Sequence, residues 1–311
     1  MKRGLIAWDK AELPPEAFEA RLSKARQALA ERDLPALIVY SDVWRSNWGR
    51  HFANFMPYWN RALLAIPADD KPVLLCSLSP RVYPWIKSVT VLEEIKPSPN
   101  LSQRVFEMCS EKGWSRIGVL DLPGLPYDLY ARLSAGPVQA VDVPVKAVHP
   151  GPDAWEISMH RRALKLAREI VAEELPGGPG LTDHEFAGRL ERKLRRAGAE
   201  DLVILVTNGD KAPAPARGAI LEEGFSVAVA LEYRGHWIKL TRPHRAINGA
   251  DLDRAPVSCT DGLSGPYPFE SLDSPPEPGH IFARHVEIES GGRRLFYGDT
   301  YLQADRGAEL L

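Results

Sequence analysis

The stretch LEEGFSVAVALEYRGHWIKLTRPH, residues 221–244, decides the fold of the second half of the chain. Its central part, residues 226–242, is rich in β-branched and aromatic residues, a composition typical of β-strands. Three further segments have the same character: 201–207, 280–290 and 293–303. Because two helical segments precede these strands, the order predicts an α+β domain with antiparallel strands.

The two helical segments have recognisable ends. The first, WEISMHRRALKLAREIVAEEL, is amphipathic and is followed by the helix-breaking PGGPG of residues 176–180. Thr182 and Glu185 form a capping box at the start of the second, and Gly198 stands where a C-terminal cap is expected. These signals predict two long helices before the sheet.

Residues 1–150 have a different pattern. Short apolar runs typical of strands alternate there with helical segments; the predicted strands are 36–40, 61–67, 71–77, 89–94, 115–122 and 138–143, and the predicted helices are 16–34, 100–112 and 126–134. This alternation predicts an α/β domain with a partly parallel sheet. The segment VHPGPDAW (148–155) interrupts the pattern. We therefore expect one domain over residues 1–150 and a second over 151–311.

Composition excludes several classes of protein. Among 311 residues, 39 basic and 41 acidic side chains give a net charge of -2, so nothing indicates binding to nucleic acid. The sequence has no run of about 18 apolar residues and therefore predicts no membrane span. Cys76, Cys109 and Cys259 are far apart and odd in number, which argues against a disulfide framework or a zinc cluster. We expect a cytoplasmic protein without a cofactor.

Four segments in the second half, in this order, resemble the creatinase, prolidase and aminopeptidase P family; they are RRALKLAREI with GLTDHEFAGRLERKLRRAGAE, then LEEGFSVAVALEYRGHWIKLTRPH, then PGHIFARHVEIES, then GDTYLQADRGAELL. The resemblance implies a creatinase-type N-terminal α/β domain followed by a shortened α+β domain of the pita-bread type. It also implies a homodimer.

The same resemblance implies that the metal ligands are missing. Active members of the family hold two divalent metals with two aspartates, one histidine and two glutamates, because hard oxygen ligands offset the charge of two close cations. Carried over one at a time, the four carboxylate positions hold Ala230, Lys239, His285 and Gly298. The histidine would lie in residues 260–269, which contain none, and the segment between Arg242 and Gly279 is shorter than in active relatives. No two-metal site is expected.

Two of these replacements suggest a different chemistry. Lys239 would supply a positive charge that binds a carboxylate or polarises a carbonyl, and His285 would act as general acid or base. Asp299 would orient His285 or pair with Lys239. In the alternative, structural interpretation, Lys239 points outward or forms an inert ion pair with Asp299 or Glu287.

Further polar residues are candidates for binding. We expect His236, Arg242 and Tyr297 to contact substrate, although Arg242 is equally explained by a structural salt bridge. A less favoured alternative is a single zinc ion held by His236, His244 and His285, whose spacing fits no standard motif.

The segment WRSNWGRHFANFMPYWN (44–60) contains six large aromatic side chains. That is more than an ordinary exposed loop carries, because apolar surface left in water is costly. We expect Trp44, Arg45 and His51 to contact a ligand or a second subunit, the alternative being a core between domains.

These observations leave three functions open. The first is a metal-independent enzyme that acts by acid/base chemistry, as a hydrolase or lyase, on a small polar molecule bearing a carboxylate or an amide. The second is a catalytically inactive pseudo-peptidase that binds a ligand or a peptide. The third is a metallohydrolase, similar to Xaa-Pro peptidases, with rearranged ligands.

Overall fold

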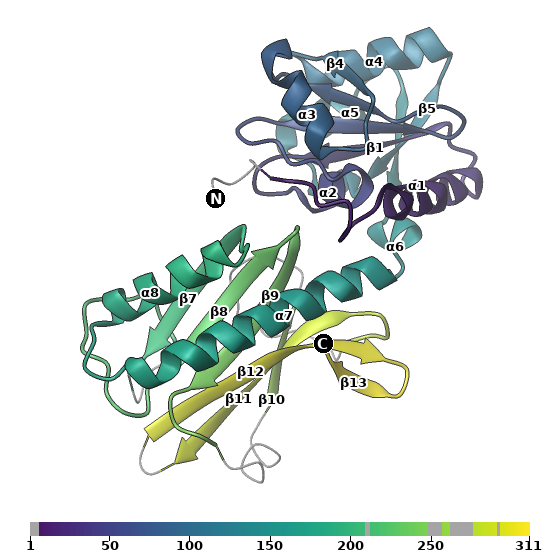
Figure 1. Ribbon diagram of the computed structural model, residues 1–311. Helices are drawn as coiled ribbons and strands as arrows, with labels where there is room; N and C mark the ends of the chain where they lie inside the picture. The colour runs from purple at the N-terminus through teal and green to yellow at the C-terminus, as the bar shows by residue number, and fades with distance from the viewer. Residues whose placement is uncertain (1–5, 209–211, 248–256, 262–275, 291–292) are drawn as a thin grey trace. The chain divides into compact units, whose positions relative to one another are not determined.

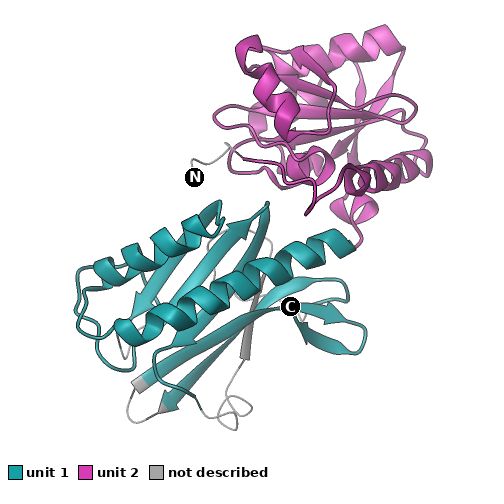
Figure 2. Ribbon diagram, viewed as in Figure 1, with its two compact units in different colours: residues 1, 151–311 teal, residues 2–150 magenta. Residues whose placement is uncertain are grey.

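The computed structural model describes residues 6–208, 212–247, 257–261, 276–290 and 293–311. The chain divides into two compact units, which we call the N-terminal unit (residues 2–150) and the C-terminal unit (residues 151–311) (Figure 2). The part of the chain that the structure describes contains no helix that is both long enough and apolar enough to cross a lipid bilayer.

The N-terminal unit is a mixed sheet covered by helices (Figure 1). Its strands, in the spatial order β4-β3-β2-β1-β5-β6, are β1 (Ala36–Ser41), β2 (Ala62–Pro67), β3 (Val73–Cys76), β4 (Glu94–Pro97), β5 (Arg116–Leu120) and β6 (Gln139–Val143). The antiparallel pairings are those of β2 with β1 and β3, and the other neighbours are parallel. The predicted α/β domain with a partly parallel sheet is confirmed.

The sheet has a hydrophobic core on each face. Leu37 and Val39 of β1 belong to one core, and Ile38 and Tyr40 belong to the other. A strand covered on both sides has no polar face, which is why residues 36–40 form a continuous apolar run. The helices of this unit are α1 (Pro15–Ala30), α2 (Asn47–Ala53), α3 (Tyr83–Val89), α4 (Leu101–Lys112), α5 (Tyr127–Ser134) and α6 (Val145–Val148).

The strand predicted at 89–94 was wrong. Strand β4 begins only at Glu94, and Val89 ends helix α3. The apolar residues Val89 and Leu92 are buried, but they lie before the strand. β4 is an edge strand with half-exposed side chains, so it lacks the apolar pattern that marks the central strands.

The C-terminal unit contains two long helices and an antiparallel sheet. The helices are α7 (Ala154–Glu174) and α8 (Asp183–Arg196); the strands are β7 (Asp201–Thr207), β8 (Ser226–Tyr233), β9 (His236–Pro243), β10 (Val257–Asp261), β11 (Ile281–Ser290), β12 (Arg293–Ala304) and β13 (Gly307–Leu310). They run in the order β10-β11-β12-β9-β8-β7, with β13 beside β12. The predicted capping box of Thr182 and Glu185 is confirmed. The sheet and its two helices confirm the predicted α+β domain.

A tight hairpin splits the central stretch of residues 226–242 into β8 and β9. Arg234 and Gly235 both have positive φ angles, of 52° and 86°, as a two-residue turn matched to the twist of its strands requires. The turn sets the register, in which Ala230 lies opposite Lys239 and Ala228 opposite Thr241. It therefore decides which side chains share a face of the sheet.

Candidate functional site

The two faces of the C-terminal sheet have different surroundings. Val229 and Leu231 of β8 and Leu240 of β9 belong to the hydrophobic core that includes residues of α7 and α8. Side chains alternate along a strand, so Ala230 and Lys239 lie on the other face. We call the first the helix face and the second the open face.

Lys239 and His285 lie on the open face on either side of strand β12. Thr241 pairs with Gly298 of β12, and Gly298 pairs with His285 of β11, so these three positions share one face. Lys239 is two residues from Thr241 and therefore has the same orientation. Its side chain is buried, with an exposed fraction of only 2%. The structure thus rules out the alternative in which Lys239 points outward into solvent.

Gly298 makes room for the imidazole of His285. A Cβ atom at Gly298 would lie 2.6 Å from Nδ1 of His285 and 3.0 Å from the carbonyl oxygen of Arg284. A side chain at this position would displace the ring. The absence of one lets His285 extend over β12 in the direction of β9.

His285 is held in its neutral form. Its pKa is lowered to about 4, mainly by burial and in part by the charge of Lys239, while the carboxylate of Asp299 acts in the opposite direction. At neutral pH the imidazole is therefore unprotonated and can accept a proton.

The backbone next to Lys239 is held by a side chain. The hydroxyl of Thr300 accepts a hydrogen bond from the backbone N–H of Lys239 at 2.8 Å and donates one to its carbonyl oxygen at 2.9 Å. Thr300 is fully buried. Strands β9 and β12 have a single paired position in their register, Gly298 with Thr241. At the next position, where Thr300 lies beside Lys239, the Thr300 hydroxyl takes the place of a backbone hydrogen-bond partner.

Asp299 is engaged on the helix face. Its carboxylate accepts hydrogen bonds from Arg168 of α7 at 2.8 and 3.0 Å, from Arg242 at 2.8 and 2.9 Å, and from the hydroxyl of Tyr297 at 3.0 Å. Asp299 follows Gly298 in the strand and so faces away from His285. The expectation that Asp299 contacts His285 or Lys239 was wrong, because these arginines and the tyrosine bind its carboxylate.

Arg242 and Tyr297 belong to the same cluster. The guanidinium of Arg242 lies 4.3 Å from the centre of the Tyr297 ring and also donates to the carbonyl oxygen of Gly298 at 2.7 Å. Burial raises the pKa of the Tyr297 hydroxyl. The structural salt bridge considered for Arg242 is present, and the cluster joins β9, β12 and α7.

The three histidines weighed as a zinc site do not share a face. His236 lies 5.0 Å, ring centre to ring centre, from His160 of α7, and His244 stacks on Phe225 at 5.4 Å. Both contacts are on the helix face, because Phe225 belongs to the core with α8. His285 is on the open face, so strand alternation separates it from the other two.

The architecture is shared with a group of solved peptidase structures. The Xaa-Pro dipeptidase from Bacillus anthracis is 18% identical over 94% of this chain and 97% of its own, with a TM-score of 0.68. The X-Pro aminopeptidase from Thermotoga maritima is 15% identical over 93% and 96%, with a TM-score of 0.72. The prolidase from Pyrococcus horikoshii is 13% identical over 94% and 97%, with a TM-score of 0.68.

This chain has the pita-bread fold of the prolidase and aminopeptidase P family. No protein-family model matches its sequence, and no curated protein does either. The resemblance noted in the sequence is thus confirmed at the level of the fold.

The open face of the pita-bread sheet does not fit a centre of two divalent metals. Such a centre needs several carboxylates that converge on one point. Around Lys239, the positions that the resemblance assigns to the other three carboxylates hold Ala230, Gly298 and the imidazole of His285, and the ammonium of Lys239 would repel a cation. Residues 262–275, which include most of the segment searched for the family's histidine, lie outside the described residues.

The aromatic segment of the N-terminal unit is partly core and partly surface. Phe52 and Phe55 are buried in the unit's own core, and Trp48 and Tyr58 pack against it. Trp44 and Trp59 are exposed by 76% and 64%. The buried rings stabilise the unit's own core, whereas Trp44 and Trp59 leave most of their surface uncovered.

The polar residues predicted with Trp44 have defined partners within this unit. Arg45 donates to the carbonyl oxygen of Gly124 at 2.6 Å. His51 is buried, its ring contacts those of Trp48 and His149, and its carbonyl oxygen accepts from Arg21. These contacts show how both side chains are held, and their expected contact with a ligand or a second subunit stays a prediction.

Proposed function

We propose that this protein is a metal-independent relative of the pita-bread peptidases. It acts by acid/base chemistry on a small polar molecule that bears a carboxylate or an amide, with Lys239 and His285 as catalytic residues. The observation that carries the proposal is the pair itself: a buried ammonium and a neutral imidazole on one face, with the imidazole packed over Gly298.

Each residue has a distinct task. The ammonium of Lys239 binds a substrate carboxylate or polarises a carbonyl oxygen, and desolvation strengthens that attraction. The neutral ring of His285 accepts a proton from the substrate or from a water molecule beside it. A bound anion offsets the charge of Lys239, so the pKa of His285 rises and the ring holds the proton more readily after its transfer.

The surrounding residues position this pair. Thr300 fixes the backbone of Lys239, and the Asp299 cluster holds β9 and β12 from the helix face. In the proposal, Asp299, Arg242 and Tyr297 are positioning residues, and His236 lies outside the reaction site. The peptidases of the same fold suggest dipeptides and acyl-amino acids as the first compounds to assay.

The test begins with the purified chain and a panel of such amides and carboxylates. His285→Gln is expected to lower turnover by a factor of about 100 or more, as removal of an acid/base group does. Lys239→Met is expected to lower it by a similar factor, as removal of an electrostatic stabiliser does. Lys165→Met, which removes an exposed lysine of α7, is the control for loss of charge and should leave turnover unchanged. Wild-type turnover in either site variant contradicts the proposal.

Two companion measurements separate the remaining functions. Metal content by plasma mass spectrometry, together with a thermal shift on metal addition, tests for a metallohydrolase; one or two equivalents of metal required for turnover would overturn metal independence. Ligand binding without turnover, weakened by Lys239→Met, would instead indicate a binding protein derived from the peptidase fold.

A further inference from the structure

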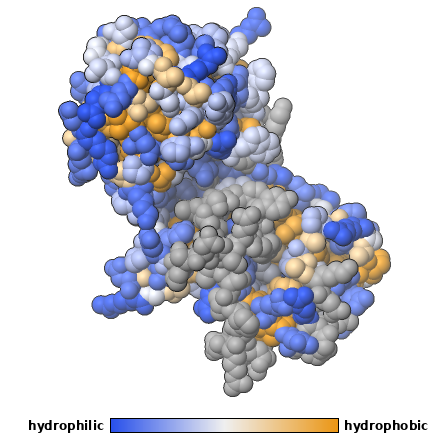
Figure 3. Space-filling view, turned by 180° about the vertical axis from the view of Figure 1, so that it is seen from behind, coloured by the Kyte–Doolittle hydropathy of each residue, from blue (hydrophilic) through white to orange (hydrophobic). Residues whose placement is uncertain are grey.

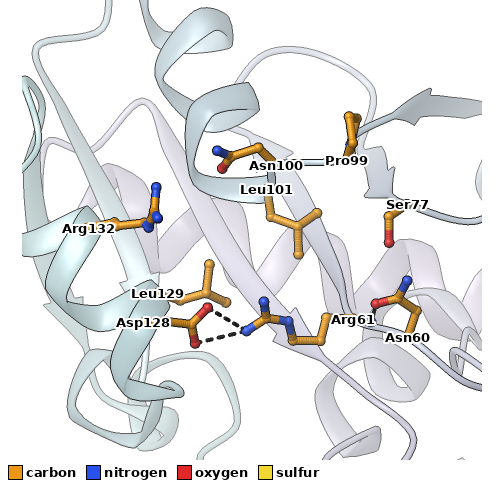
Figure 4. Close-up of a pocket in the computed structure, with 9 residues that line it drawn as sticks. All are labelled: Asn60, Arg61, Ser77, Pro99, Asn100, Leu101, Asp128, Leu129 and Arg132. Atoms are coloured by element: carbon orange, nitrogen blue, oxygen red, sulfur yellow. Dashed lines mark hydrogen bonds and ion pairs between the residues drawn. The ribbon is translucent and has the colours of Figure 1, made fainter.

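The N-terminal unit contains a polar pocket at the carboxyl edge of its parallel strands (Figure 4). Ser77 follows the end of β3, and Asn100 follows β4 and precedes α4. Asn60 and Arg61 precede β2, whose direction is opposite, so they reach the same edge. In open α/β sheets, ligands bind outside the carboxyl ends of the strands.

The pocket is suited to a small ligand. Its volume is about 200 Å³, below the range of pockets that hold drug-sized molecules. In Figure 4, Arg61 reaches from the side of Asn60 and Ser77 toward Asp128, while Leu101 and Leu129 lie between the polar groups. The pocket is thus small and mainly polar, with a limited apolar part.

Hydrogen-bond donors exceed acceptors in this pocket. Arg61 donates from Nη1 to both oxygens of Asp128, at 2.8 and 2.7 Å, which occupies the carboxylate and leaves Nε and Nη2 of Arg61 without another described partner. The guanidinium of Arg132 has no hydrogen bond or ion pair with any residue in the described ranges. The side-chain oxygen of Asn60 accepts from the backbone N–H of Arg61, and that of Asn100 accepts from the N–H of Gln103 in the first turn of α4, so their amide N–H groups are the atoms they can offer.

The net charge of the pocket, like its excess of hydrogen-bond donors, favours an anionic ligand. Two guanidinium groups and one carboxylate line the pocket, which gives it a net positive charge. Guanidinium groups bind carboxylate and phosphate oxygens with paired, charge-assisted hydrogen bonds.

We propose that this pocket binds a small oxyanion, a molecule bearing a carboxylate or a phosphate group, through Arg61 and Arg132. Asn60, Ser77 and Asn100 contribute neutral donors, and Asp128 holds Arg61 in place while it competes for that arginine's charge. All of these residues belong to the N-terminal unit. The inference therefore stands or fails independently of Lys239 and His285.

Calorimetric titration of the full-length protein tests the proposal with three probes. Inorganic phosphate and succinate carry the two kinds of oxyanion, and succinamide has the shape of succinate without its charge. We expect binding of phosphate, of succinate or of both, and none of succinamide. The absence of binding by both anions at millimolar concentration, or equal binding of succinamide, overturns the proposal.

Variants locate the site. Arg132→Gln and Arg61→Gln are expected to weaken anion binding by about tenfold each, the loss typical of one hydrogen bond to a charged group. Asp128→Asn is expected to strengthen it several-fold, because the competing carboxylate is removed. Lys24→Gln, which removes an exposed charge from α1, should have no effect.

The opposite signs at Arg132 and Asp128 make this test specific to the pocket. The Arg61–Asp128 pair is half exposed, so its loss should change the stability of the unit little. Unchanged binding in both arginine variants, or weaker binding in Asp128→Asn, would place the anion elsewhere and contradict the proposal.

Discussion

The two faces of the C-terminal sheet hold different buried ionisable groups. On the helix face, Asp299 is surrounded by two guanidinium groups and a tyrosine hydroxyl. On the open face, the charge of Lys239 helps to lower the pKa of His285, because it disfavours the protonated ring. A carboxylate bound by two guanidinium groups stabilises a fold, whereas a lysine beside a neutral imidazole offers an anion a charge and offers a proton an acceptor.

This contrast suggests how one strand serves both purposes. Gly298 and Asp299 are adjacent in β12, and alternation sends one to each face. The glycine leaves space for His285, while the aspartate ties the strand to β9 and α7. The helix face is thus the support of the open face.

Loss of the Asp299 charge should have the largest effect on this arrangement. Asp299→Asn leaves Arg168 and Arg242 without their shared carboxylate, and breaking a buried ion pair costs about 3–5 kcal/mol. Urea unfolding followed by circular dichroism measures it. Glu287→Gln is the matched control, because its pair with Arg294 is half exposed and should contribute less than about 1 kcal/mol. Equal losses in both variants would remove the distinction between the faces.

The protonation of His285 should make stability depend on pH. Its pKa is about 4 in the folded protein and close to 6.5 in the unfolded chain, so the unfolded state binds a proton first as pH falls. This contribution is fully present above pH 6.5 and is lost toward pH 4, by about 3 kcal/mol at most. His285→Gln should flatten the profile over that window.

The same histidine reports on Lys239 directly. In Lys239→Met, an NMR titration should give a higher pKa for His285, but one still below 6.5 because burial remains the larger cause. A pKa that does not move would show that the ammonium and the ring are not neighbours, and the open-face site would lose its basis.

The smallest of the three stability effects is expected at Gly298. Gly298→Ala forces a methyl group against His285 and should cost about 1–3 kcal/mol. In the double variant with His285→Ala the cost should shrink, because the ring that the methyl group meets is gone. Gly188→Ala in helix α8, where the added atom meets only a side-chain tip at 3.6 Å, should stabilise the protein slightly. Thermal unfolding of the wild type, Gly298→Ala, His285→Ala, the double variant and Gly188→Ala checks both signs.

Local chemistry in the sequence accounts for most of the fold. Thr182 and Glu185 cap a helix because their side chains satisfy backbone groups within one turn, and residues 36–40 form a strand because both faces are buried. The edge strand β4 could not be predicted in the same way, because its side chains are half exposed and its pairing with β3 is a long-range contact.

The candidate site shows the same division. The sequence by itself, through the family resemblance, predicted Lys239 and His285 at positions where the family has carboxylates, and it offered a structural salt bridge as one interpretation of Arg242. Only the tertiary structure decided that Asp299 is that partner, that His236 and His244 lie on the helix face, and that Arg61 and Arg132 share a pocket. The physical reason is that strand pairing and the face of a side chain are set by register between distant segments, which no local pattern contains.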